Sequence, residues 1–72
     1  MTANPILLQK KYARVVAEFA HKAGISLDDA LRAFYHSATY ELMRDGVSDM
    51  HCRSDEYLAD ELLIELKEGK LQ

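Results

Sequence analysis

The stretch FYHSATYELM, Phe34 to Met43, holds three of the six aromatic residues of this 72-residue chain and lies at its middle. Two helical patterns meet inside it. Ser37 and Thr39 interrupt the apolar spacing, and such side chains readily hydrogen-bond to nearby backbone. We therefore expect one helix to end near His36 and a short helix to follow it. The aromatic residues should form the point on which a long first helix and a long last helix pack.

The segments on both sides of this stretch carry helix signals. Asn4-Pro5 is typical of a helix start and Gly24 of a helix end, and apolar residues recur between them at steps of three and four. Ser26 and Ser54 are each followed by acids, which suit the positive end of the helix dipole. The predicted helices cover residues 5–23, 27–36, 39–44 and 54–68.

No stretch of the chain keeps the alternation of a strand. Residues 47–53 have no clear period, and we expect them to form an ordered loop. The sequence therefore predicts one all-α domain over residues 1–72, a compact orthogonal bundle of three to four helices. The expected core residues are Phe34, Tyr40, Phe19, Leu31 and Leu62.

Size and composition limit the class of protein. At 8.2 kDa the folded chain should expose about 4,500 Å². Cys52 is the only cysteine, so an internal disulfide is excluded, as is usual in a reducing compartment. No apolar run has the length of a membrane span, and the N-terminal charges follow the short apolar run, unlike those of a signal peptide. We expect a cytoplasmic protein with no membrane partner.

Charge is unevenly distributed along the chain. Residues 1–36 carry five Lys or Arg and three Asp or Glu, whereas residues 37–72 carry four and nine. The basic half and the acidic last helix could pair within the fold, or both could be solvated helix faces. The net charge of −3 disfavours non-specific binding to nucleic acid.

The residues that could carry chemistry are not grouped in any recognised pattern. His21 and His36 fall on the polar sides of their helices, and neither has a second ligand at helical spacing. Asp49, His51 and Cys52 are close in sequence but lack the paired spacing of zinc sites. A bundle this small also has little room for a substrate pocket of several hundred Å³. We expect no catalytic, cofactor or metal site, and no enzyme activity.

A small DNA-binding transcriptional regulator is the alternative, because the second and third predicted helices are short and close together. A recognition helix needs basic and amide side chains for phosphates and base edges. The third helix offers only Arg44, between Glu41 and Asp45. The first helix has a small basic face, formed by Lys10, Lys11 and Arg14.

The last helix has a second apolar edge. Tyr57 and Ile64 lie opposite its main leucine stripe, flanked by charged residues. Apolar groups on two sides indicate either a helix between two layers or a helix that meets another chain. The ordinary alternative is two isolated exposed residues, which are common on protein surfaces.

The run Phe-Tyr-x-Ser-x-Thr-Tyr-x-Leu at residues 34–42 is followed by Met50-His51 and by the acidic-hydrophobic helix from Ser54. Together with Gly24-Ile25-Ser26 and Asp29-Ala30, this pattern resembles a family of small bacterial domains of unknown function over residues 8–69. The chain departs from it at Met50, where the family has tryptophan. The resemblance implies an all-helical intracellular protein and, since some relatives are encoded beside toxin-like or ADP-ribosyltransferase-like proteins, an antitoxin-like role. It supplies no catalytic residues.

These observations together predict a non-enzymatic interaction module that binds itself or a protein partner. The expected contact surface centres on Tyr57 and Ile64, with Tyr35 as a further contributor.

Overall fold

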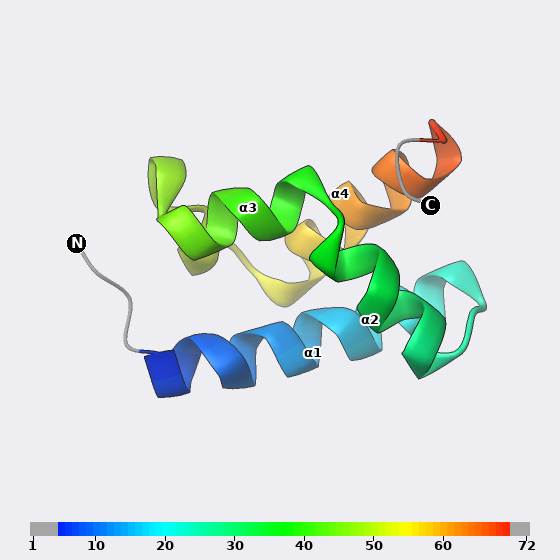
Figure 1. The fold of residues 1–72 in the computed structure, drawn as a ribbon, viewed down its shortest axis with the longest axis horizontal. Helices are drawn as coiled ribbons and strands as arrows, with labels where there is room; N and C mark the ends of the chain where they lie inside the picture. The colour runs from blue at the N-terminus through cyan, green and yellow to red at the C-terminus, as the bar shows by residue number, and fades with distance from the viewer. Residues whose placement is uncertain (1–4, 70–72) are drawn as a thin grey trace.

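The structure is a computed structural model that describes residues 5–69, and these form α-helices and one 3₁₀ segment with no strand (Figure 1). The all-α prediction is confirmed, and the predicted helix bounds are each within one residue of those observed. The predicted cap Asn4 lies outside the described residues. The elements are α1 (Pro5–Ala23), α2 (Leu27–Tyr35), α3 (Ala38–Asp45), η1 (Val47–Cys52) and α4 (Asp55–Lys67).

Local signals set the helix ends as the sequence predicts. Gly24 has φ +68°, the left-handed conformation in which glycine has no steric penalty. The Ser26 hydroxyl accepts a hydrogen bond from the Asp29 N–H at 3.1 Å, and the Ser54 hydroxyl accepts one from the Tyr57 N–H at 3.0 Å. Each cap satisfies an N–H group that lacks a partner within its own helix.

Ser37 forms the break between α2 and α3 with one buried hydroxyl. Its Oγ donates to the Phe34 carbonyl at 2.6 Å and accepts from the Tyr40 N–H at 2.9 Å. The same atom therefore satisfies the last turn of α2 and the first turn of α3. This arrangement turns the chain within two residues, His36 and Ser37, while Ser37 stays only 1% exposed.

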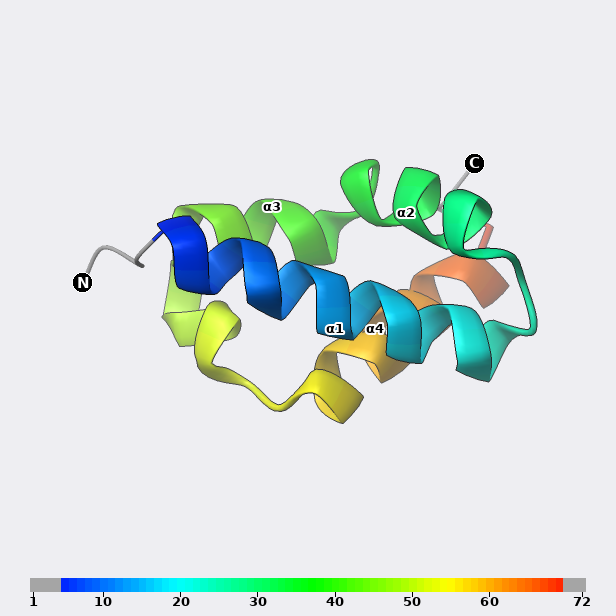
Figure 2. The same ribbon diagram turned by 90° about the horizontal axis from the view of Figure 1, so that it is seen from below.

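The core lies where α1 crosses α4, with α2 and α3 following one another along the side of this pair (Figure 2). Phe19, Phe34 and Leu62 are fully buried, as predicted, and Tyr40 is partly buried against the ring of Tyr12. The long first and last helices pack mainly on each other, whereas the Phe34–Met43 stretch covers one side of them. The folded surface of 4730 Å² agrees with the value expected from mass.

Leu31 is the core prediction that the structure contradicts. Its side chain is 43% exposed, and Leu27 beside it is 60% exposed. The apolar positions of α2 span about 200° of its circumference, and only the side formed by Ala30, Ala33 and Phe34 faces the bundle. Within residues 5–69 there is no further element to cover the rest.

The segment predicted as an ordered loop is the 3₁₀ segment η1, kinked at Ser48 and Asp49. These two residues have φ of +52° and +55°, a region that side chains other than glycine seldom adopt. Because these two consecutive residues break the regular helix, the apolar residues of this segment do not recur at helical spacing. Over residues 5–69, no helix combines the length and apolar content that crossing a bilayer requires.

Candidate interaction surfaces

The three residues predicted to form a contact surface are all substantially exposed. Tyr57 is 43% exposed, Ile64 49% and Tyr35 44%. Single exposed apolar side chains are common on protein surfaces, and these three leave apolar area that a partner could cover.

The structure brings two of the three together. Tyr57 and Ile64 are seven residues apart on α4, which places them on one edge of the helix about 10 Å apart along its axis. Tyr35 lies elsewhere. Its ring packs edge-on against Tyr40 at 4.9 Å between centroids, whereas Ile64 and Leu42 line one groove. Because Tyr40 and Leu42 point about 160° apart around α3, Tyr35 and Ile64 belong to different flanks of that helix.

Ile64 lines a groove between α3 and α4. The groove has a volume of about 260 Å³ and an apolar floor that includes Leu42 and Met50. Its rim is acidic. The lining residues are Ala38, Thr39, Leu42, Met50, Glu61, Ile64, Glu65 and Glu68.

One of the rim acids has a structural role. The Glu65 carboxylate accepts hydrogen bonds from the Ala38 N–H at 2.9 Å, the Thr39 N–H at 3.2 Å and the Thr39 hydroxyl at 2.6 Å. A side chain of α4 thus caps α3 from 26 residues away, and its negative charge lies at the positive end of the α3 dipole. This contact fixes the distance between the two walls of the groove.

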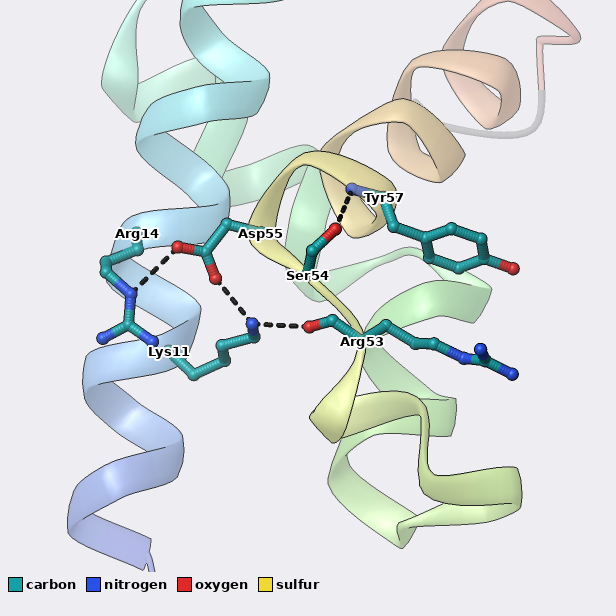
Figure 3. Close-up of polar contacts among 6 residues, drawn as sticks. All are labelled: Lys11, Arg14, Arg53, Ser54, Asp55 and Tyr57. Carbon is teal, nitrogen blue, oxygen red and sulfur yellow. Dashed lines mark hydrogen bonds and ion pairs between the residues drawn. The ribbon is translucent and has the colours of Figure 1, made fainter.

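The Tyr57 end of the surface is held to α1 by a polar cluster (Figure 3). The Asp55 carboxylate accepts from Lys11 Nζ at 2.6 Å and from Arg14 Nε at 3.0 Å, and Lys11 also donates to the Arg53 carbonyl at 2.6 Å. Hydrogen bonds from Lys11 and then Arg14 hold the pKa of the Asp55 carboxyl below its ordinary value, against the opposing effect of its partial burial. The Arg53 guanidinium lies 5.5 Å from the Tyr57 ring centroid.

Much of the positive charge of α1 is therefore paired with acidic residues of α4 in the same chain. Lys22 pairs with Asp60 at 3.1 Å and lies 3.9 Å from Glu56, and its hydrogen bond to Asp60 raises the pKa of the lysine. Of the two alternatives that the sequence left open for the basic first half and the acidic last helix, these contacts show the pairing within the fold. Of the basic face considered for DNA phosphates, Lys11 and Arg14 are bound to Asp55.

A second apolar surface was not recognised from the sequence. Leu27, Leu31 and Tyr35 recur at steps of four along α2, and all three are exposed. We call this set the α2 stripe. These steps of four can be read from the sequence, but apolar residues that face a core recur at the same steps. The structure distinguishes an exposed stripe from a core face, because α1 covers the side of α2 that carries Ala30 and Ala33 and leaves the stripe uncovered.

The polar residues of η1 lie near one another without forming a ligand set. Cys52 is exposed, and His51 is partly buried with a buried Nδ1 that has no hydrogen-bond partner within the described residues. His21 and His36 are both exposed. Across residues 5–69, no three His, Cys, Asp or Glu side chains are grouped so that they could hold a metal ion.

Comparisons with protein-family models, with curated proteins and with solved structures find no match to this chain. The resemblance to a family of small bacterial domains stays a prediction. The function must therefore be argued from the surfaces that the fold presents.

Proposed function

We propose that this protein is a non-enzymatic interaction module whose role is to bind another protein chain. The observation that supports this proposal is the exposure of large apolar side chains on two separate faces: Tyr57 and Ile64 on α4, and the α2 stripe. Large apolar side chains that are exposed together on one face of a small protein are a feature of interaction sites. Association would also add stability to a domain that has little core of its own.

Two kinds of partner are consistent with these faces. The α2 stripe is a slanted row of exposed apolar side chains on one helix, which a second copy could meet across a two-fold axis. The α4 edge carries charged neighbours and suits a different protein, in keeping with the antitoxin-like role that the resemblance implies. We place the protein in the cytoplasm, where the exposed thiol of Cys52 would stay reduced.

The first test is the mass in solution, measured by light scattering over a concentration series. Self-association through the α2 stripe should produce a mass that rises with concentration in the wild type and stays that of a monomer in Leu31→Glu. Arg32→Glu, which changes the charge of an exposed neighbour on the same helix, is the matched control and should behave as the wild type. At a concentration low enough for the wild type to be monomeric, thermal unfolding of both variants should match the wild type, since neither side chain is part of the core.

If the wild type is monomeric throughout, the α2 stripe is not a self-association surface. Tagged protein should then capture a partner that Leu31→Glu or Ile64→Glu fails to capture. A monomer that captures the same proteins in wild-type and both variant forms would contradict the interaction proposal.

A further inference from the structure

We infer that the groove between α3 and α4 binds a basic amphipathic helix of a different protein. This inference rests on the proposed function and specifies the partner of one of its two faces. The groove has an apolar floor that includes Leu42 and Met50, a half-exposed Ile64 in its wall, and a volume of about 260 Å³. These properties suit the apolar side chains of an incoming segment.

The shape of the surface favours a helix as the occupant. Tyr57, Glu61 and Ile64 of α4 and its C-cap residue Glu68 follow one another at steps of three and four along a single edge, and all of them except Tyr57 line the groove. This row is about 16 Å long, the length of about three helical turns. Helices bind such grooves through apolar residues at positions i, i+3 or i+4, and i+7.

The charge around the groove selects a basic partner. Glu61, Glu65 and Glu68 line it together, and none of the lysine or arginine residues that the structure describes does. Glu61 forms no ion pair with any residue that the structure describes, and Glu65 is bound to backbone and hydroxyl groups rather than to a cation. Lysine or arginine side chains beside the apolar face of a partner helix would meet these carboxylates.

The same charges argue against a second copy in this groove. Lys11, Arg14 and Lys22 of α1, which would be the natural basic helix of a second copy, are already paired with acids of α4 in their own chain. The chain as a whole carries a net charge of −3. Self-association through the acidic groove would bring like charges together.

The test uses two synthetic peptides of about 14 residues, with leucines at i, i+3, i+4 and i+7 and either lysines or glutamates at the flanking positions. Fluorescence anisotropy measures their binding to the full chain at low salt. We expect the lysine peptide to bind and the glutamate peptide to bind at least about tenfold more weakly. Amide NMR shifts should move around Leu42 and Ile64, while those around Leu31 stay unchanged.

Three variants locate the site. Ile64→Glu should weaken binding of the lysine peptide by about tenfold or more, because it places a charge in the apolar wall. Glu61→Gln should weaken binding by up to about fivefold and reduce its dependence on salt. Leu31→Glu, on the α2 stripe, should leave binding unchanged. All three residues are exposed or partly exposed, so native-like amide spectra are expected for each variant.

Equal binding of the lysine and glutamate peptides would overturn the inference, as would an equal loss of lysine-peptide affinity in Leu31→Glu and Ile64→Glu. Either result would show that the peptides bind through non-specific apolar contacts. No binding of the lysine peptide would also overturn it. A concentration-dependent mass that Ile64→Glu abolishes would show that a second copy occupies the groove. That result would refute the basic partner but support the interaction proposal, so the two can fail separately.

Discussion

Replacing Glu65 by alanine should destabilise the fold far more than its position in a surface groove suggests. The carboxylate accepts three hydrogen bonds from the first turn of α3, and Thr39, which supplies two of them, is only 4% exposed. Ala38 is exposed, so water can replace its bond. A buried donor left without a partner costs about 1–3 kcal/mol. Because the groove admits some water, we take the low end for both Thr39 groups and add the lost helix-dipole interaction, about 2–3 kcal/mol in all.

This loss is large for a chain of this size, whose total stability should be about 4–11 kcal/mol. Urea unfolding followed by circular dichroism at 222 nm measures it, and the thermal midpoint should fall by about 10–20 °C. Glu61→Ala is the matched control. It removes another carboxylate from the same groove but breaks no hydrogen bond between described residues, so its effect should stay within about 0.5 kcal/mol.

A double-mutant cycle isolates the contact itself. Thr39→Val removes the hydroxyl bond of 2.6 Å to Glu65 with little change in shape. The loss caused by Thr39→Val should be smaller by about 1–2 kcal/mol in the Glu65→Ala background than in the wild type. Equal losses for Glu65→Ala and Glu61→Ala, or a coupling energy of zero, would refute the role of Glu65 as the cap of α3.

Three further predictions concern the core, the ion pairs and the turns. Phe34→Ala should cost about 3–5 kcal/mol in urea unfolding and Leu31→Ala less than about 1 kcal/mol, and similar losses would show that Leu31 is buried in solution. Because the pKa of Asp55 is lowered in the folded state, its stabilisation is present above the unfolded-state pKa of about 3.9 and is lost as the pH falls through the folded-state value. Asp55→Asn should therefore unfold more readily than the wild type at pH 7, by about 1 kcal/mol after solvent screening. The two stabilities should converge as the pH is lowered below about 4, and a gap that persists in acid would contradict this reading. Gly24→Ala should lower the thermal midpoint by the equivalent of about 1 kcal/mol, since a Cβ there meets no atom within 4 Å and only the backbone conformation is strained. Gly24→Asn should cost less, and equal costs would point to a cause other than the left-handed φ.

Helix positions could be predicted because the signals that set them are local. Ser26, Ser37 and Ser54 each bond the N–H group three residues ahead, and Gly24 needs only a permissive φ. Neither interaction depends on a distant part of the chain. The dual role of Ser37, which also donates to the Phe34 carbonyl, extends only three residues in each direction.

The candidate surfaces could be predicted only in part. Tyr57 and Ile64 oppose the leucine stripe within one helix, so their position on the side away from that stripe follows from the sequence of α4 alone, whereas their exposure follows from the fold. Their separation from Tyr35 does not follow from the sequence, because it depends on how α2 and α3 pack along the side of the α1–α4 pair. The groove beside Ile64 also joins α3 and α4, with Met50 of η1 added to its floor.

The sequence by itself determined that this protein is helical, where each helix begins and ends, and which faces of α1 and α4 are apolar. These properties depend on periodicity and capping within a few residues. The tertiary structure alone decided that Leu31 is exposed while Phe34 is buried, and that Glu65 caps a helix 26 residues earlier in the chain. Both outcomes depend on which helices pack together. When the apolar residues of a helix span a wide arc, as in α2, the neighbouring helices decide which of them are buried.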